Sequence, residues 1–163
     1  MAGKTTLAWE LARSMPGKTA VVSVDQLLRG SIAVGDVDAV TELAMAHTQL
    51  RLLVANYLKN RYHVVVEGPF YFEVEGRPVS YESDIDQLLA LMRNLAEKTL
   101  VVRLTASPEA LTERARRAGR EAELPAALRL QAAYKARYGD RFCSFDSDET
   151  PAAGIAAAAR AFF

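Results

Sequence analysis

The chain has 163 residues, enough for one compact domain with a buried core and few for two domains. Half of the residues are hydrophobic, and 20 Lys and Arg balance 20 Asp and Glu, which excludes the basic excess of a protein that coats nucleic acid. The single cysteine, Cys143, excludes an intramolecular disulfide and a multi-cysteine zinc site. No apolar run approaches the roughly 20 residues of a membrane helix, and the first residues lack the apolar stretch of a secretory signal. These features predict one cytoplasmic domain that does not bind a membrane.

Helical and strand-like segments alternate along the chain. Helices are predicted where apolar residues recur at helical spacing: 5–14, 40–60, 84–94, 108–120, 128–138 and the residues after 151. Strands are predicted in four short β-branched runs: 19–24, 62–66, 99–104 and 142–145. The first two runs are apolar enough for burial on both faces. Residues 70–81 alternate around Glu75-Gly76 and are open to two interpretations, a hairpin or an extended, lid-like loop. The alternation predicts the α/β class, with a parallel sheet between helices.

Local signals mark several helix ends and some structural residues. Ser107 is expected to cap a helix whose first residue is Pro108, and Ser83 or Asp84 is expected to cap the helix before it. Residues 30–38 are predicted to form a loop. The following residues are interpreted as structural rather than chemical: His47 and Trp9 as packing residues, Cys143 as inert core, and Asp146 and Asp148 as caps of the last helix.

The first predicted helix opens with Gly3-Lys4-Thr5-Thr6, the second half of the phosphate-loop motif G-x-x-x-x-G-K-[ST]. Gly3 allows a tight turn whose amides face an anion, Lys4 reaches the β- and γ-phosphates, and the Thr5 hydroxyl binds Mg²⁺. The positive end of the helix dipole adds to the attraction. The sequence therefore predicts a phosphate site formed by Ala2, Gly3, Lys4, Thr5 and Thr6.

The chain resembles P-loop kinases of the nucleoside-monophosphate-kinase group, nearest to the chloramphenicol-phosphotransferase-like and zeta-toxin-like small-molecule kinases. The likeness follows the order of elements through nearly the whole chain and is carried by these segments: Ala2–Thr5, Val24–Leu28, Val64–Gly68, the arginines from Arg114 to Arg120, and Tyr134–Asp148. It implies a three-layer P-loop NTPase fold, a parallel sheet with helices on both faces, formed by residues 1–163 as a single domain with a lid around 114–124. Residues 70–81 match nothing in these kinases, and Glu67 stands where many of them have aspartate.

The first glycine of the motif would fall before Met1, and so would the strand that precedes the loop and is central to the sheet in these kinases. Two explanations are open: Met1 is an internal methionine of a longer chain, or the protein has lost its first strand. Because every later element is in place, the first explanation is favoured.

Two acidic residues follow predicted strands, where a parallel sheet delivers side chains to a cleft. The resemblance implies that Asp25 accepts the proton of a substrate hydroxyl. Alternatively, Asp25 caps a short helix over 26–29. The resemblance also implies that Glu67 holds a Mg²⁺ water or an acceptor hydroxyl, and a solvated acid at a strand end is equally open.

Arginines gather where the resemblance implies a lid. Arg114 and Arg120 are expected to stabilise charge on the transferring phosphate, whereas Arg116 and Arg117 are assigned to the surface. A solvated helix face is the alternative for all four residues. On the acceptor side, the candidates are Arg29 and Arg51. In the kinases that the chain resembles, the loop that holds Asp146 and Asp148 lies beside the adenine, so contact with the base is the alternative to helix capping for these two residues.

The sequence predicts an enzyme that uses ATP and Mg²⁺ to phosphorylate a hydroxyl of a small molecule resembling an antibiotic, a sugar or a nucleoside. One alternative is a polynucleotide 5′-hydroxyl kinase, which the zero net charge and the lack of an aromatic–basic groove disfavour. Another is a nucleotide-binding module without catalysis, because the phosphate loop is incomplete.

Overall fold

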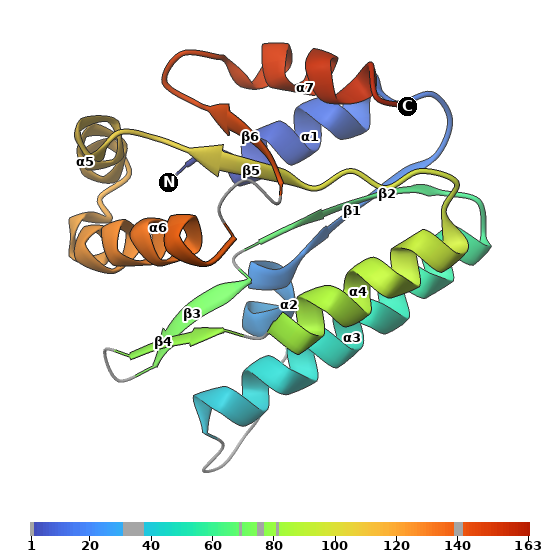
Figure 1. The fold of residues 1–163 in the computed structure, drawn as a ribbon, viewed down its shortest axis with the longest axis horizontal. Coiled ribbons are helices and arrows are strands. Elements are labelled where there is room, and N and C mark those ends of the chain that lie inside the picture. The colour runs from blue at the N-terminus through green and yellow to red at the C-terminus, as the bar shows by residue number, and fades with distance from the viewer. Residues whose placement is uncertain (1, 31–37, 69, 75–76, 81, 139–141) are drawn as a thin grey trace.

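The computed structural model describes residues 2–30, 38–68, 70–74, 77–80, 82–138 and 142–163 (Figure 1). Its helices are α1 (Lys4–Ser14), α2 (Val24–Gly30), α3 (Ala39–Lys59), α4 (Glu82–Leu95), α5 (Pro108–Arg117), the 3-10 turn η1 (Glu121–Glu123), α6 (Leu124–Tyr138) and α7 (Ala152–Arg160). Its strands are β1 (Thr19–Ser23), β2 (His63–Glu67), β3 (Tyr71–Val74), β4 (Arg77–Ser80), β5 (Val102–Thr105) and β6 (Cys143–Asp146). Every predicted helix and strand is present, with shifted ends.

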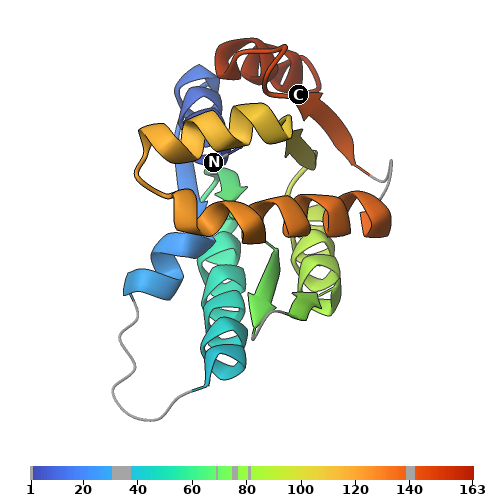
Figure 2. The same cartoon turned by 90° about the vertical axis from the view of Figure 1, so that its left-hand side faces the viewer.

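The elements form layers around the strands. In Figure 1, α1 and α7 lie together on one side of β1, β2, β5 and β6, and α3 and α4 lie on the other. Figure 2 looks onto the end of the molecule where α5 and α6 lie in front of the strands. The predicted mixed α/β architecture, with parallel strands between helices, is confirmed. In the described part of the chain, no helix is long and apolar enough to cross a membrane.

The described strands pair two by two. β1 runs parallel to β2, β5 runs parallel to β6, and β3 and β4 form an antiparallel hairpin. The hairpin settles the two interpretations of residues 70–81 in favour of paired strands, although Glu75 and Gly76 lie outside the described residues. Most of the loop predicted at 30–38 also lies outside them, and its end residues belong to α2 and to the cap of α3. Among the described residues, no ladder joins β2 to β5, so the parallel strands form two separate pairs.

The burial of β2 differs from its prediction as a strand buried on both faces. His63 is exposed, and Val64, Val65 and Val66 are half-buried, whereas Val22 of the neighbouring β1 is buried. Among the described strands, β2 has a hydrogen-bonded neighbour on one edge alone, so its valines keep part of their surface in contact with solvent.

Two helices bridge the parallel pairs from opposite faces. From α1, Leu7 packs with Val102 and Leu104 of β5, and the same helix also contacts β1 and β2. From α4, Leu88 joins the cluster of β1 and β2, while Leu89 packs with Val101 just before β5. Burial of such side chains is the main favourable term in folding, so these helices hold the two pairs together.

Helix caps confirm one prediction and correct another. Ser107 caps α5 by accepting a hydrogen bond from Ala110 N at 3.1 Å, with Pro108 in the first turn, as predicted. The cap predicted for α4 is wrong, because this helix begins before Ser83 and Asp84 and includes both in its first turn.

Three residues interpreted as structural have different surroundings. His47 is 1% exposed and meets the ring of Phe70 edge-on at a centroid distance of 6.0 Å, which confirms a packing role. The prediction that Cys143 lies in the core is wrong, because its side chain is exposed on β6, which pairs with β5 along one edge. Trp9 is 48% exposed on α1, so it contributes little packing, contrary to its prediction.

Gly68 brings the end of β2 against the start of α2. Its φ of 155° is one that side-chain-bearing residues rarely adopt, and a Cβ placed there would lie 2.6 Å from Val24 Cβ. Val24 is fully buried and cannot withdraw without opening the core. A glycine at this position therefore fixes how closely the residues after β1 approach those after β2.

Replacing Gly68 by alanine is expected to lower the free energy of unfolding by about 2–4 kcal/mol, because it adds both backbone strain and an overpacked contact. Denaturant titration measures the change. Gly30→Ala is the matched control, since no atom lies within 4 Å of a Cβ at that position. If the two variants were equally stable, the close approach of Gly68 to Val24 would not constrain the fold.

Candidate functional site

The amino end of α1 has a backbone suited to binding an anion. Gly3 adopts φ 87° and ψ 14°, a left-handed conformation that favours glycine, and its carbonyl accepts the first helical hydrogen bond from Leu7 N at 2.9 Å. Within the described residues, no side chain caps this helix, and its first turn contains no acidic residue. The positive end of the helix dipole is therefore not neutralised by the helix itself.

A hydroxyl and a carboxylate meet beside this turn. Thr5 Oγ1 donates to Glu67 Oε2 at 3.4 Å, although 62 residues separate them in the sequence. Glu67 is 6% exposed, so the alternative of a solvated acid at the strand end is wrong. Burial disfavours an isolated carboxylate, and such a group gains from a nearby cation or hydrogen-bond donor.

The two oxygens of this pair are hard donors of the type that Mg²⁺ prefers. Mg²⁺ usually takes one or two protein oxygens and completes its shell with water and phosphate oxygens, so a pair is a sufficient protein contribution. In the described part of the chain, no cluster of three or more His, Cys, Asp and Glu side chains offers a site held by protein ligands alone. The pair fits Mg²⁺ that is held jointly with a phosphate ligand.

Asp25 lies near the same end of the strands, half-buried in the first turn of α2. The register of β1 against β2 pairs Ser23 with Glu67, so the two chain segments leave the sheet side by side. The amino end of α2 is capped by Ser23, whose hydroxyl accepts from Gln26 N at 3.4 Å. The alternative that Asp25 caps this helix is therefore wrong, and its carboxylate is not used for that purpose.

Arg120 stands at the start of η1 and pairs with an acid of the same turn. Both its Nε and Nη2 donate to the carboxylate of Glu123, the Nε contact at 2.8 Å. These bonds, together with the more distant negative charge of Asp25, raise the pKa of Arg120 above its ordinary value. The structure thus pairs this predicted lid arginine with an acid three residues further along the chain.

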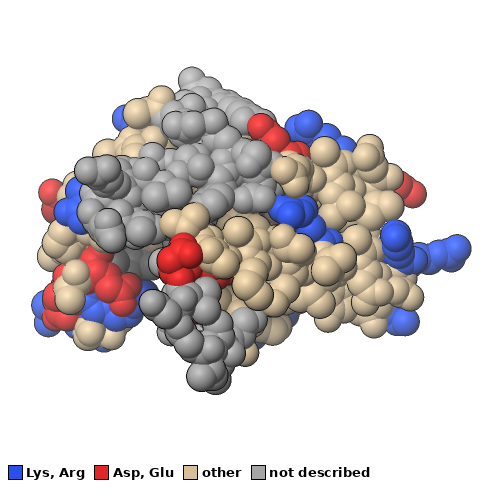
Figure 3. Space-filling view, turned by 90° about the horizontal axis from the view of Figure 1, so that it is seen from below, with Lys and Arg blue, Asp and Glu red and all other residues tan. Residues whose placement is uncertain are grey.

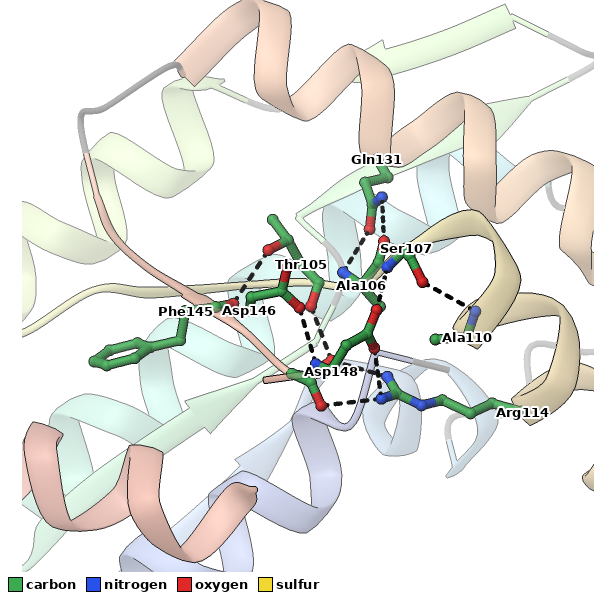
Figure 4. Close-up of polar contacts among 10 residues, drawn as sticks. Thr105, Ala106, Ser107, Ala110, Arg114, Gln131, Phe145, Asp146 and Asp148 are labelled. Carbon is green, nitrogen blue, oxygen red and sulfur yellow. Dashed lines mark hydrogen bonds and ion pairs between the residues drawn. The ribbon is translucent and has the colours of Figure 1, made fainter. Parts of the chain in front are cut away.

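Arg114 is held by the loop that links β6 to α7 (Figure 4). Its Nη1 donates to Ser147 Oγ at 2.8 Å, and its Nη2 donates to the carbonyl of Ser147 at 3.0 Å and to Asp148 Oδ1 at 2.9 Å. The other oxygen of Asp148 accepts from Ser107 N at 2.6 Å, where α5 begins. Arg114 is thus fixed against the end of β6.

The role predicted for Asp146 and Asp148 as caps of the last helix is wrong. The residue at the cap position of α7 is Pro151, which has no side-chain cap, and Asp146 Oδ1 instead accepts from Asp148 N at 2.9 Å. The bond from Ser107 N, and then the charge of Arg114, hold the pKa of Asp148 below its ordinary value. Its carboxylate therefore stays ionised at neutral pH.

A cavity of about 170 Å³ connects the amino end of α1 to Arg114. The residues that line it are small, apolar or hydroxyl-bearing, except for the arginine: Ala2, Gly3, Thr6, Leu7, Leu104, Arg114, Ser147, Thr150, Ala152 and Ile155. A lining of small and apolar residues with a few polar groups is typical of sites that bind small organic ligands. A larger, open groove of about 520 Å³ lies between the carboxyl half of α1 and α7, away from the Thr5–Glu67 pair.

The remaining predicted arginines lie on α5, α3 and α2. Arg116 and Arg117 are exposed and pair with Glu113 of the same helix, which confirms their assignment to the surface. Arg51 is half-buried on α3, and its Nη2 donates to Thr48 Oγ1 at 3.1 Å. Arg29 lies in the last turn of α2, and its side chain is outside the described part of the structure.

Two residues of this region carried no signal in the sequence. Ser147 donates from both its N and its Oγ to the carbonyl of Thr105, and so ties the loop after β6 to the end of β5. Gln131 of α6 donates to the carbonyl of Ala106 at 2.8 Å and accepts from its N at 3.3 Å. From the sequence alone, a serine and a glutamine at these positions are expected to be ordinary surface residues, because their partners lie far away along the chain.

A left-handed turn that begins a helix and a buried carboxylate, meeting where parallel strands end, are typical of the P-loop nucleotide-binding class. Comparison with protein-family models agrees with this class. The chain matches the model of an AAA domain over residues 2–139 and belongs to that family. A search of curated proteins found no match. Membership of this P-loop NTPase-like family, which includes kinase-like members, points to nucleotide binding.

Proposed function

We propose that the protein is a kinase that uses ATP and Mg²⁺ to phosphorylate a hydroxyl group of a small molecule. The observation that carries the proposal is the contact between Thr5 and Glu67 beside the left-handed turn at Gly3. A hydroxyl, a buried carboxylate and an uncapped helix end are the parts that a nucleotide triphosphate and its cation require.

In this proposal the nucleotide lies along the amino end of α1. Its phosphates contact the amides after Gly3 and the Lys4 ammonium, and its base occupies the cavity beside Thr6. Arg114 lines that cavity with its hydrogen bonds already directed to Ser147 and Asp148, which leaves the flat face of the guanidinium for contact with a ring. These bonds favour a role for Arg114 on the nucleotide side over one on the transferring phosphate.

Thr5 and Glu67 would hold Mg²⁺ together with the phosphates. The cation would neutralise charge on the phosphate oxygens. The burial of Glu67 keeps its carboxylate aimed at this one place, and the bond from Thr5 orients it. The cost of burying the negative charge is offset when a cation arrives.

Asp25 and Arg120 are the proposed acceptor-side groups. Asp25 would accept the proton of the attacking hydroxyl, because its carboxylate is not used as a helix cap and lies on the segment that leaves β1 beside Glu67. Arg120, which stands at the start of η1 after the arginine-bearing helix α5, would stabilise negative charge on the transferring phosphate. Arg29, in the last turn of α2, is the proposed acceptor contact.

A small acceptor is favoured over a polynucleotide. On the face in Figure 3, the described Lys and Arg side chains lie scattered among uncharged surface and Asp and Glu side chains. The chain as a whole has zero net charge. Binding of a polynucleotide derives much of its affinity from neutralised phosphates, which such a surface does not supply.

We further propose that one more parallel strand lies between β2 and β5 in the nucleotide-binding form of the fold. Three observations support it: the absence of a described ladder between these strands, the half-exposed valines of β2, and the contacts that α1 and α4 make with both pairs from opposite faces. A strand in that position would pair with both free edges and bury those valines.

Lys4→Ala is expected to weaken ATP binding by about 10- to 100-fold, because it removes a charge-assisted contact with the phosphates. Calorimetric titration with ATP in the presence of Mg²⁺ measures the effect, and chelation of Mg²⁺ is expected to weaken binding to the unmodified protein as well. Lys59→Ala, which removes an exposed lysine at the end of α3, is the control. Unchanged ATP affinity in Lys4→Ala would rule out the phosphate site.

Asp25→Asn is expected to slow phosphate transfer by about 10²- to 10⁴-fold while ATP affinity is retained, because the variant keeps the shape of the side chain but loses the base. The assay follows labelled phosphate from ATP into a panel of nucleosides, sugars and hydroxylated antibiotics, and in a separate arm into an oligonucleotide with a free 5′-hydroxyl. Glu97→Gln, an exposed acid between α4 and β5, is the control.

The panel also distinguishes the alternatives. Labelling of the oligonucleotide alone would replace the small-molecule proposal by a polynucleotide kinase. ATP binding without any transfer would indicate a nucleotide-binding module. Transfer by Asp25→Asn at the unmodified rate would remove Asp25 as the base.

The strand proposal is tested by fusing an apolar, β-branched segment of about five residues and a glycine-containing turn to the amino end of the chain. The fusion is expected to raise the melting temperature by several degrees and to tighten ATP binding, because it completes the ladders of β2 and β5. A fusion of the same length with polar residues is the control. Equal melting temperatures for the two fusions would contradict the proposal.

A further inference from the structure

We propose that Asp148 is a positioning residue for the nucleotide: it fixes the Arg114 guanidinium in the wall of the 170 Å³ cavity and so sets the affinity for the base end of ATP. The inference rests on the proposed ATP binding and adds a residue that neither the fold class nor the phosphate loop assigns. Asp148 itself is not among the residues that line the cavity, so it acts through Arg114.

The first step is the orientation of Arg114. Its two terminal nitrogens make three hydrogen bonds, all to Ser147 and Asp148, and its side chain is 33% exposed (Figure 4). An arginine side chain loses considerable rotamer entropy when it is ordered. Because these bonds order Arg114 within the protein, less of that entropy remains to be lost when a ring binds against it.

The second step is that one carboxylate serves two partners. Asp148 Oδ1 accepts from Arg114 Nη2, and Oδ2 accepts from Ser107 N at the first turn of α5, the helix that carries Arg114. Asp148 thus holds both the guanidinium and the start of its helix. An asparagine has one acceptor oxygen and an NH₂ group that only donates. It can therefore accept from one of the two donors, and its NH₂ group would face the other donor without forming a hydrogen bond.

The third step is the rigidity of the loop that presents Asp148. Both the N and the Oγ of Ser147 donate to the carbonyl of Thr105, at 2.9 and 2.8 Å, which ties the loop to the end of β5. The N of Asp148 donates to Asp146 Oδ1. A carboxylate on a loop fixed in this way can hold Arg114 in one place rather than follow it.

The test separates the base end of the nucleotide from its phosphates. Calorimetric titrations use two probes in the presence of Mg²⁺: ATP, and inorganic tripolyphosphate, which has no base. Asp148→Asn is expected to weaken ATP binding about tenfold and to leave tripolyphosphate binding within about twofold. Glu149→Gln, which neutralises the adjacent exposed acid, is expected to change neither affinity.

A double-mutant cycle tests whether Asp148 acts through Arg114. Arg114→Ala is expected to weaken ATP binding at least as much as Asp148→Asn does, and adding Asp148→Asn to Arg114→Ala is expected to change the affinity by less than about twofold. Should Asp148→Asn fail to fold, as judged by thermal melting, Ser147→Ala removes another acceptor of Arg114 and is expected to weaken ATP binding in the same selective way.

Three outcomes overturn the inference. ATP affinity that is unchanged in Asp148→Asn removes its role in binding. An equal loss of affinity for ATP and for tripolyphosphate, or additive effects in the cycle, assigns Asp148 to general stability. If the unmodified protein binds tripolyphosphate and not ATP, the base cavity is wrong, whereas binding of neither probe overturns the proposed function and with it this inference.

Discussion

The register of β1 against β2 determines where the chemical groups of this protein lie. Pairing Ser23 with Glu67 makes the two strands end at the same level, so that the chain enters α2 where β2 finishes. The residue after Glu67 is Gly68, and only a glycine can lie as close to Val24 as this residue does. As a result, Glu67 points toward Thr5 of α1, and Asp25 begins the neighbouring helix. A slip of one residue would exchange the two faces of the strand and separate these groups.

Much of the fold could be predicted from short-range patterns. The β-branched runs became strands, the helical spacing of apolar residues over 40–60 became the buried face of α3, and the Ser107-Pro108 pair began α5. Features that depend on distant neighbours could not be predicted in this way. The exposure of the β2 valines reflects which strands flank β2, and the exposure of Cys143 reflects the position of β6 beside β5. The local periodicity of the sequence predicts neither arrangement.

The candidate site likewise contains features that could be predicted from local sequence patterns and features that could not. The turn at Gly3 and the acid at the end of β2 were predictable, because a phosphate loop and the carboxyl end of a parallel strand have local signatures. The contacts of Asp148 were not, since they join residues that are 34 and 41 positions away along the chain. An aspartate shortly before a predicted helix is expected, from the local sequence, to cap that helix. The packing of α5 against the β6–α7 loop instead gives its carboxylate partners on α5.

The exposed position of Trp9 has a practical consequence. It is the chain's single tryptophan and lies about one turn from Thr5 and Thr6 on the helix whose amino end faces the proposed phosphates. An indole ring that is half in contact with water emits light whose colour and intensity depend on the polarity around it. The protein therefore has one intrinsic fluorophore, on the helix whose amino end faces the proposed phosphates, without any attached label.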